Sequence, residues 1–366
     1  MHMMTRHLQG RSCICPRTQA DAIRDRFLLA HQQSEREYRS ISRRRKKALM
    51  EAEKKGREKV CVTGAAGFIA SWFVELLLSK GYIVHGTVRD PSTHEKNAHL
   101  WSLDKAPENL KLFKADLLDY DSLRSAIEGC SGVFHAASPV IISPLEVIEP
   151  AVKGTSNVLK ASLEAKVKRV VYVSSLAAVG MNPNLPKGQV IDETCRSDED
   201  YCRKMEKWYC LSKTLAEKEA FGFAEGNGID VVTVCPSLTL GPLLQPTVNA
   251  SSKILVDVMK GVHDPVPNRI RNIGDARDVA AAIVLAYEKP EAKGRYICTG
   301  YPIKMLDLVN KLRSLYPGYS YPTTFTDIEE NVVISTRKLQ GLGWTARPLE
   351  ETLVDSVESF RRIGIL

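Results

Sequence analysis

No run of apolar residues in this 366-residue sequence approaches the roughly 20 positions that a transmembrane helix needs. Three local signatures are also missing: the Gly-x-Ser-x-Gly nucleophile elbow, the Gly-Lys-Ser/Thr phosphate loop and the His-Glu-x-x-His zinc helix. We therefore expect no membrane partner. The sequence gives no support to a serine hydrolase, a P-loop nucleotide hydrolase or a zinc protease.

Cysteine is present but has no pairing pattern. The nine cysteines are an odd number, and no Cys-x-x-Cys pair occurs among them. Disulfide frameworks and zinc sites both require regular spacing, so neither is predicted. We expect reduced thiols, a cytoplasmic location and no bound metal ion.

Net charge is concentrated at one end of the chain. The whole sequence carries +8, but residues 1–59 alone contain 16 Lys and Arg against 7 Asp and Glu, which leaves the rest close to neutral. The predicted folded part therefore lacks the basic character of a nucleic-acid-binding protein, and no such partner is expected. We interpret residues 1–57 as a basic N-terminal extension, disordered or loosely helical. A targeting peptide is the alternative, although acidic residues within the segment argue against it.

From Lys59 onward, short apolar segments alternate with helical patterns. Strands are predicted at 59–63, 83–88, 110–115, 132–136, 169–174 and 229–235. Helices are predicted at 68–80, 120–128, 146–165 and about 201–226. This succession is typical of an α/β, Rossmann-type fold, a doubly wound parallel sheet with helices on both faces. Ligands of such sheets bind at the carboxyl ends of the strands, so functional residues are expected there.

Regular alternation ends at Pro236, and turns rich in proline and glycine separate shorter elements beyond it. We expect residues 58–240 to form a dinucleotide-binding Rossmann domain. Residues 241–366 are expected to form mainly a smaller, irregular α/β substrate-binding lobe, with some segments returning to the Rossmann domain. Within them, helices are predicted at 275–288 and 349–361, and strands at 295–299 and 332–335.

A glycine turn follows the first predicted strand. Residues 60–72 read Val-Cys-Val-Thr-Gly-Ala-Ala-Gly-Phe-Ile-Ala-Ser-Trp, so a strand leads through two glycines into an apolar helix. The first glycine suits the tight turn, and the second lets the backbone approach a pyrophosphate at the positive end of the helix. This spacing also occurs in structural turns, so the prediction depends on the strand before it and the helix after it. The predicted cofactor-binding residues here are Gly64, Ala65, Ala66, Gly67, Phe68, Ile69 and Ala70.

The second predicted strand ends in Thr87-Val88-Arg89. An acidic residue at this point accepts the ribose hydroxyl of NAD, whereas a basic one favours the 2′-phosphate of NADP. Arg89 can bind a phosphate with two hydrogen bonds, and Lys96 could add a second charge. Asp90 could instead contact the ribose, or both cations could simply be solvated. We favour NADP as the cofactor.

Two further strand ends are candidate cofactor contacts. Asp116 and Leu117 follow the third predicted strand and could contact the adenine. Ala136, Ala137 and Ser138 follow the fourth, where small side chains would let a cofactor pass close to the backbone. Both segments could equally be ordinary packing.

Ser175, Tyr209 and Lys213 are the candidate catalytic residues. Tyr209 and Lys213 are four residues apart, so on a helix the phenol and the ammonium share one face. A nearby cation stabilises a phenolate, so Lys213 is predicted to lower the pKa of Tyr209. Ser175 follows the fifth strand and could donate a hydrogen bond to a substrate carbonyl oxygen. These residues would support hydride transfer from a nicotinamide to a carbonyl carbon, with Tyr209 protonating the oxygen.

Several segments in order resemble the extended short-chain dehydrogenase/reductase family, and within it the plant cinnamoyl-CoA reductase and dihydroflavonol reductase branch. The similarity covers about residues 58–366. It is carried by Val-Thr-Gly-Ala-Ala-Gly-Phe-Ile-Ala-Ser-Trp at 62–72, Val-Arg-Asp-Pro at 88–91, Val-Phe-His-Ala-Ala-Ser-Pro at 133–139, Val-Ser-Ser at 173–175, Trp-Tyr-Cys-Leu-Ser-Lys at 208–213 and Gly-Pro-Leu-Leu-Gln-Pro-Thr-Val-Asn at 241–249.

This resemblance implies the same roles for Ser175, Tyr209 and Lys213, and 2′-phosphate contacts for Arg89 and Lys96. It also implies an aromatic substrate in a cleft between two lobes. The further cofactor contacts that it implies are Pro236, Ser237, Leu238, Thr239 and Ser251.

One departure from the family pattern concerns the substrate. Cinnamoyl-CoA reductases typically read Asn-Trp-Tyr-Cys-Tyr-Gly-Lys around the catalytic tyrosine, whereas residues 207–213 here read Lys-Trp-Tyr-Cys-Leu-Ser-Lys. The Leu-Ser pair and the first Lys look more like the broader group of reductases that act on aldehydes or ketones. Reduction of a CoA thioester is therefore left open.

The sequence thus predicts an NADPH-dependent reductase of an aromatic, phenylpropanoid-type aldehyde, ketone or hydroxycinnamoyl-CoA thioester, acting as a monomer or homodimer. Two alternatives stay open. A nucleotide-sugar epimerase or dehydratase shares the fold and the Tyr/Lys pair, but such enzymes usually retain NAD, which Arg89 disfavours. A dinucleotide-sensing protein without turnover would not need Ser175, Tyr209 and Lys213 to be intact.

Overall fold

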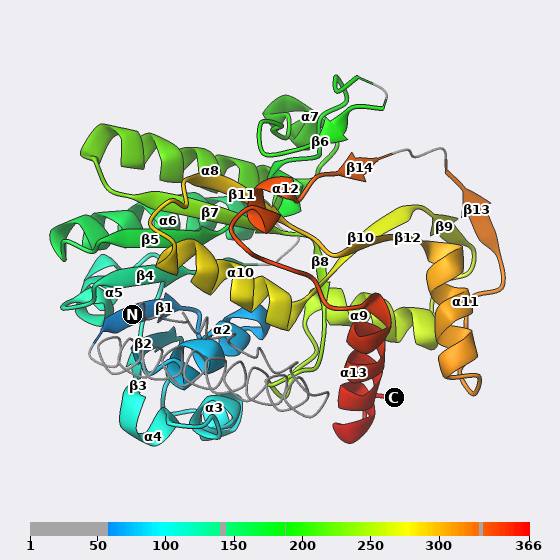
Figure 1. The fold of residues 1–366 in the computed structure, drawn as a ribbon, viewed down its shortest axis with the longest axis horizontal. Helices are drawn as coiled ribbons and strands as arrows, with labels where there is room; N and C mark the ends of the chain where they lie inside the picture. Colours follow the sequence, from blue (N-terminus) through cyan, green and yellow to red (C-terminus); the bar gives the residue numbers. More distant parts are fainter. Residues whose placement is uncertain (1–57, 140–143, 187, 329–331) are drawn as a thin grey trace, which may run out of the picture. The chain divides into compact units, whose positions relative to one another are not determined.

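The computed structural model describes residues 58–139, 144–186, 188–328 and 332–366 (Figure 1). The predicted N-terminal extension, residues 1–57, lies outside these ranges.

The central sheet has seven parallel strands in the order β11-β7-β5-β4-β1-β2-β3. They are β1 (Lys59–Thr63), β2 (Ile83–Val88), β3 (Leu110–Lys114), β4 (Gly132–His135), β5 (Arg169–Val173), β7 (Val231–Pro236) and β11 (Gly294–Cys298). The strand order reverses between β1 and β4, which pair directly. This topology confirms the predicted doubly wound fold, and it places the ligand crevice of such a sheet at the carboxyl ends of β1 and β4.

Helices cover both faces of this sheet (Figure 1). On one face lie α2 (Phe68–Ser79) and α10 (Ala276–Glu288), and on the other lie α5 (Tyr120–Ile127), α6 (Pro144–Glu164) and α8 (Trp208–Asn227). Val60 and Val62 of β1 belong to the core beneath α2 and α10, and Cys61 belongs to the core on the opposite face. Both sets are buried because successive side chains of a strand alternate in direction, which explains the unbroken apolar runs in the sequence.

A second group of elements surrounds a core of its own at the right of Figure 1. This group contains a three-stranded sheet of β8 (Leu238–Leu240), β10 (Ile270–Asp275) and β12 (Tyr301–Lys304), and a pair of strands, β9 (Val266–Asn268) and β13 (Phe325–Asp327). The helices α9 (Ala250–Met259), α11 (Met305–Leu315) and α13 (Leu349–Arg362) contribute most of this second core. A separate pair, β6 (Val190–Ile191) and β14 (Val333–Ile334), lies at the top of Figure 1 and packs in a small core of its own. The remaining short helices are α3 (His94–Trp101), α4 (Ala106–Asn109), α7 (Glu199–Lys204), α12 (Arg337–Gln340) and the 3₁₀ helix η1 (Leu176–Ala178).

The predicted helix at about 201–226 is wrong in one respect, because the structure has two helices there. Helix α7 ends at Lys204 and α8 begins at Trp208. Between them Glu206 has a left-handed φ of 52°, which no helix interior accommodates. Tyr209 therefore lies in the first turn of α8.

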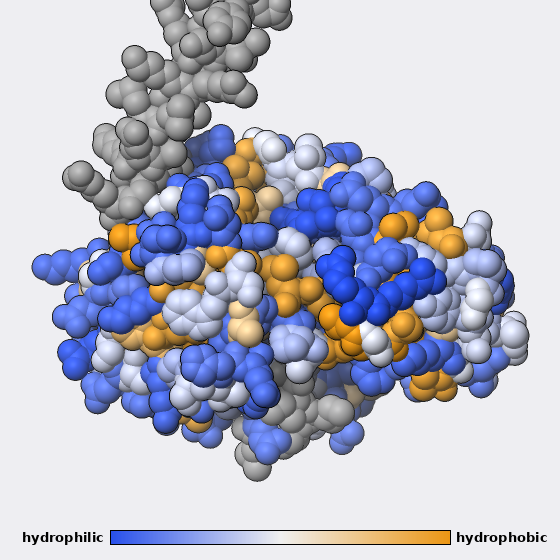
Figure 2. All heavy atoms as spheres, turned by 90° about the horizontal axis from the view of Figure 1, so that it is seen from below, coloured by the Kyte–Doolittle hydropathy of each residue, from blue (hydrophilic) through white to orange (hydrophobic). Residues whose placement is uncertain are grey.

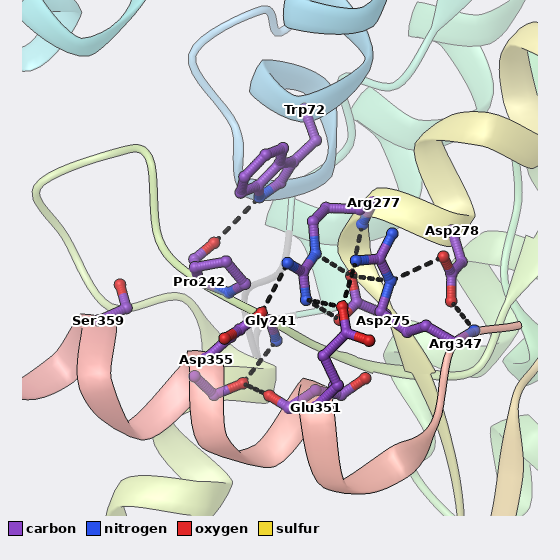
Figure 3. Close-up of polar contacts among 12 residues, drawn as sticks. Trp72, Gly241, Pro242, Asp275, Arg277, Asp278, Arg347, Glu351, Asp355 and Ser359 are labelled. Atoms are coloured by element: carbon purple, nitrogen blue, oxygen red, sulfur yellow. Dashed lines mark hydrogen bonds and ion pairs between the residues drawn. The ribbon is translucent and has the colours of Figure 1, made fainter.

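A network of ion pairs joins α10 to α13 (Figure 3). Arg277 binds Asp275 through Nε and Nη2, both at 2.9 Å, and its Nη1 lies 2.7 Å from Asp355 Oδ2. Arg347 Nε donates to Asp278 Oδ1 at 2.9 Å. The side chain of Asp275 is almost fully buried, and a buried carboxylate is tolerated only when it is paired. The network therefore fixes α13 to the first turn of α10.

The segment after β8 is held between two helices in the same region (Figure 3). Gly241 N donates to Ser356 Oγ and Leu243 N donates to Ser359 Oγ, both at 2.8 Å, which ties the segment to α13. Trp72 Nε1 of α2 donates to Pro242 O at 3.0 Å. The helix that follows the glycine turn thus contacts the second core directly.

Replacing Arg347 by leucine is expected to lower the free energy of unfolding by about 2–4 kcal/mol, because the carboxylate of Asp278 stays buried without its partner. Urea denaturation measures this change. Arg362→Leu, at the exposed end of α13, is the matched control and should stay within about 0.5 kcal/mol of the parent. Equal losses in the two variants would show that the network contributes nothing specific.

Hydrophobic and hydrophilic residues are mixed over the face shown in Figure 2, where the hydrophobic ones form several separate patches. Apolar atoms make up more than half of an ordinary protein surface, so such patches do not by themselves mark a binding face. Within the described ranges, every helix is too short or too polar to cross a lipid bilayer.

Candidate active site

The turn between β1 and α2 is tight and lies against the end of β4. Gly64 has a φ of +66°, and a Cβ atom there would lie 3.0 Å from Ala137 Cα. The Gly64 N–H donates to Thr87 Oγ1 at 3.1 Å, and the Gly67 N–H donates to Gly64 O at 2.9 Å. Both the backbone conformation and the contact with Ala137 therefore disfavour a side chain at position 64.

Helix α2 begins directly after this turn with its first N–H groups uncapped by a side chain, because its N-cap is Gly67. Gly67 is exposed and has an ordinary φ of −74°. Its backbone conformation does not require glycine, but the absence of a side chain leaves the start of the helix open to solvent. The positive end of α2 is thus available to an anionic group. Of the other predicted residues in this segment, Ala65, Phe68 and Ala70 are buried, and Ala66 and Ile69 are half-buried.

Thr63 holds the end of β4 beside the glycine turn. Its Oγ1 accepts hydrogen bonds from the N–H groups of Ala136 at 3.1 Å and Ala137 at 3.0 Å, and lies 2.9 Å from His135 Nδ1. Burial lowers the pKa of His135 to about 3, so this histidine is a neutral packing residue. Thr63 was not among the predicted site residues. The only sequence signal for it was its position directly before Gly64.

Four buried hydroxyl groups at strand ends have no hydrogen-bond partner among the described residues. Two of them belong to predicted cofactor-binding residues, Ser138 Oγ after β4 and Ser237 Oγ after β7, and the other two are Ser174 Oγ after β5 and Thr299 Oγ1 after β11. Leaving a buried hydroxyl unpaired is costly, so a polar ligand that reached these positions would be stabilised. Together with the glycine turn and the uncapped end of α2, these hydroxyls fit a site for a dinucleotide.

The structure brings Ser251 to the segment that joins β7 to β8. Ser251 Oγ donates to Thr239 O at 2.6 Å and accepts from Asn249 Nδ2, also at 2.6 Å. Pro236 is the buried last residue of β7, and Leu238 is the first residue of β8. Residues 236–239 and Ser251 are therefore one local cluster, although 12 positions separate Ser251 from Thr239 in the chain.

Arg89 lies exposed at the end of β2, and no ion pair involves it among the described residues. Asp90 turns into its own loop, where its carboxylate accepts from Ser92 N at 2.9 Å, Ser92 Oγ at 2.6 Å and Thr93 Oγ1 at 3.1 Å. These hydrogen bonds lower the pKa of Asp90 and occupy both carboxylate oxygens. Arg89 is thus the better candidate for a ligand contact, and Lys96 is also exposed, on α3.

Asp116 and Leu117, which follow β3, make contacts with neighbouring residues of the protein that explain their positions without a ligand. Asp116 Oδ1 accepts from Leu118 N at 2.8 Å. Leu117 packs against α6, where a Cβ atom on Gly154 would lie 2.7 Å from Leu117 Cβ, and its carbonyl accepts from Asn157 Nδ2 at 2.9 Å. An adenine contact for Asp116 and Leu117 stays a prediction.

Gly64→Ala is expected to raise the dissociation constant of NADPH at least about tenfold, because left-handed backbone costs roughly 1–2 kcal/mol in a residue with a Cβ and the methyl group would press on Ala137. Fluorescence titration with NADPH measures this. Gly222→Ala in α8 is the control: a Cβ there meets nothing within 4 Å, so binding should be unchanged. Undiminished binding by Gly64→Ala would show that the turn does not depend on this glycine.

Ser175, Tyr209 and Lys213 come together at the carboxyl end of β5. Tyr209 lies near enough to Ser175 for the serine hydroxyl to influence its pKa, and Ser175 Oγ accepts from Ala177 N at 3.2 Å and caps η1. Lys213 is buried, and its Nζ donates to Val173 O at 3.1 Å. The three predicted catalytic side chains therefore lie around the last residues of one strand, where the doubly wound fold places its ligands.

The direction of the pKa change at Tyr209 is opposite to the predicted one. Burial raises the pKa of Tyr209, and the nearby Ser175 hydroxyl lowers it by less. Lys213 does not offset this, because its ammonium is directed to the Val173 carbonyl and burial lowers its own pKa to about 8. Tyr209 consequently keeps its proton near neutral pH, which is the state that a proton donor requires.

No group of three or more His, Cys, Asp and Glu side chains within the described ranges is arranged to hold a metal ion. The cysteines of these ranges are free thiols.

The family model described as "NAD dependent epimerase/dehydratase family" matches residues 60–298, about two thirds of the chain. The chain belongs to this family. Within it, the chain is 47% identical over 311 residues to cinnamoyl-CoA reductase 1 of Petunia hybrida, an alignment that covers 84% of this chain and 93% of that protein. The predicted place in the extended short-chain dehydrogenase/reductase family is thereby confirmed.

Solved structures of the same fold include two reductases. Vestitone reductase from alfalfa (Medicago sativa) superposes with a TM-score of 0.74 at 32% identity, over 85% of this chain and all of that one. The yeast methylglyoxal/isovaleraldehyde reductase Gre2, solved as a complex with NADPH, superposes with a TM-score of 0.74 at 26% identity, over 84% of this chain and all of that one.

Proposed function

We propose that this chain reduces the carbonyl group of a small aromatic substrate with NADPH, and that Tyr209 is its proton donor. The chain is an NADP-dependent oxidoreductase, because its similar relatives and structural neighbours are reductases of one family. The observation that supports the mechanism most directly is the meeting of Ser175, Tyr209 and Lys213 at the end of β5.

The residues that would hold the cofactor lie at or just after the carboxyl ends of the strands. The glycine turn from Gly64 to Gly67 and the uncapped start of α2 would hold the pyrophosphate, and Arg89 would bind the 2′-phosphate. Ser138 and Ser237 would each gain a partner for a buried hydroxyl. NADPH, when bound, supplies the hydride for the carbonyl carbon.

The chain's own residues would handle the oxygen and its proton. Ser175 would donate a hydrogen bond to the carbonyl oxygen, and Tyr209 would deliver a proton to it as negative charge develops there. The raised pKa of Tyr209 suits reduction, because the phenol must be protonated before the reaction starts. An aldehyde or ketone would leave as an alcohol. A thioester would expel its thiolate and leave as an aldehyde.

The substrate class is proposed from the relatives. The relative named cinnamoyl-CoA reductase supports an aromatic CoA thioester, and the neighbours named vestitone reductase and methylglyoxal/isovaleraldehyde reductase support a free carbonyl compound. The Leu-Ser pair at 211–212 is the reason to keep all three classes in view. A cytoplasmic location and a monomeric or homodimeric state are further parts of the proposal.

The test is purified protein with NADPH and three aromatic substrates: a hydroxycinnamoyl-CoA thioester, the corresponding aldehyde and an aromatic ketone. We expect at least one to be reduced with consumption of one NADPH per carbonyl reduced, and NADH to be the poorer reductant. If none of the three is turned over while NADPH still binds, the proposed reaction is wrong.

A further inference from the structure

A buried carboxylate lies on the same face of α8 as the candidate catalytic residues. Glu217 follows Lys213 by four residues and Tyr209 by eight, a spacing that brings all three to one side of a helix. Glu217 is 1% exposed and Lys213 is 4% exposed. A carboxylate buried this deeply needs a partner, and its partner connects α8 to the rest of the site.

Arg295 of β11 is that partner. Its Nε donates to Glu217 Oε1 at 3.0 Å and its Nη2 donates to Oε2 at 2.5 Å, so the pair is held by two hydrogen bonds. Thr233 Oγ1 and Cys235 Sγ of β7 also donate to Glu217 Oε1, at 2.8 and 3.5 Å. Glu217 therefore fixes α8 against two strands of the central sheet.

Arg295 also reaches the segment that supports Ser175. Its Nη1 donates to the carbonyl oxygen of Cys195 at 2.5 Å. Two residues later, Ser197 Oγ donates to Ala177 O at 2.8 Å, in the short helix that Ser175 caps. A continuous set of contacts thus runs from α8 through Glu217 and Arg295 to the turn that carries Ser175.

We propose that Glu217 is a positioning residue for the reductase reaction, which fixes Tyr209 and Lys213 relative to Ser175 and places a negative charge one helical turn from the Lys213 ammonium. This inference rests on the proposed function, because it takes those three residues to be catalytic.

The charge of Glu217 matters because, apart from its charged partner Arg295, the other ionisable groups around Lys213 are neutral. Burial raises the pKa values of Tyr172, Tyr209 and Cys235 and lowers that of His135, so none of these groups is charged near neutral pH. Burial likewise lowers the pKa of Lys213 to about 8, and the negative charge of Glu217 acts against that change. Without the carboxylate, the ammonium would lose its proton at a lower pH.

The test uses Glu217→Gln and the double variant Glu217→Gln/Arg295→Met. The double variant removes both charges of the pair, so it keeps the test possible if an unpaired Arg295 prevents folding. Glu225→Gln, at an exposed position near the end of α8, is the matched control for loss of one carboxylate from the same helix. Circular dichroism establishes which variants are folded.

The first readout is the titration midpoint of Lys213, measured by NMR on protein with ¹³C-labelled lysine side chains, with the signal assigned by its loss in Lys213→Met. We expect the midpoint to fall by about one pH unit in both Glu217 variants and to stay unchanged in Glu225→Gln. The second readout is kcat, expected to fall about tenfold or more in both Glu217 variants, with the basic limb of its pH profile moved to lower pH.

The two hypotheses fail in different ways. An active wild-type enzyme whose Lys213 midpoint and kcat are unchanged in a folded Glu217 variant would overturn the role of Glu217 alone. A wild-type protein that reduces none of the three substrates would overturn the proposed function, whatever the NMR titration shows, because that titration needs no turnover.

Discussion

Replacing Tyr209 by phenylalanine is expected to lower kcat about 10³-fold, within the range that a positioned general acid contributes. Phenylalanine keeps the aromatic ring in the first turn of α8 and removes only the hydroxyl group, which lies near Ser175. Because the hydroxyl acts on the reacting oxygen, the dissociation constant of NADPH should change by less than about threefold. Steady-state kinetics and a fluorescence titration with NADPH measure the two quantities.

The control for this substitution is Tyr301→Phe, which removes a hydroxyl from an exposed tyrosine on β12. Its kcat should equal that of the parent. If Tyr209→Phe keeps kcat within about tenfold of the parent, another group must deliver the proton, because so small a fall in kcat is below the usual effect of losing a general acid.

Replacing Arg89 by alanine is expected to raise the Michaelis constant for NADPH about 10- to 100-fold and to leave that for NADH nearly unchanged. A hydrogen bond to a charged group contributes roughly 1.5–3 kcal/mol, and each 1.4 kcal/mol is a factor of ten. NADH lacks the 2′-phosphate, so removing Arg89 takes no hydrogen bond away from it. Initial-rate measurements with both cofactors at a fixed carbonyl concentration give the comparison.

The structure makes this a sharp test, because the neighbouring carboxylate of Asp90 is occupied by Ser92 and Thr93. Arg124→Ala, at the end of α5, removes an exposed arginine away from the strand ends and should affect neither cofactor. Equal losses for NADPH and NADH in Arg89→Ala would contradict a phosphate contact and would indicate a general effect on the loop.

The central sheet could be predicted from the sequence because local composition determines it. The runs at 59–63 and 83–88 are apolar and β-branched, are buried on both faces, and have the same bounds in the structure as in the prediction. The strands β9 and β13 were not predicted. They pair across almost 60 residues, Val266 opposite Phe325, and such pairing leaves no local signal. The break between α7 and α8 was missed because the helical pattern continues on both sides of Glu206.

In the site, residue type and spacing predicted which side chains meet, but not their protonation. Tyr209 and Lys213 share a helix face, as their separation of four residues requires. The raised pKa of Tyr209 depends on burial, and the direction of the Lys213 ammonium depends on the Val173 carbonyl. Neither the burial of Tyr209 nor the direction of the Lys213 ammonium can be predicted from the sequence alone. The same holds for Glu217, whose partner Arg295 lies 78 residues away in the chain.

Transfer of deuterium tests the central claim most directly. Wild-type protein is incubated with a reducible aromatic carbonyl compound and NADPH that carries deuterium at C4 of the nicotinamide ring, and the product is examined by mass spectrometry and NMR. When the deuterium lies on the face of the nicotinamide ring from which hydride is transferred, we predict one deuterium on the former carbonyl carbon of the product. The oxygen-bound proton of the product should come from solvent. Consumption of NADPH with no deuterium in the product from either face would contradict hydride transfer to the carbonyl and with it the proposed mechanism.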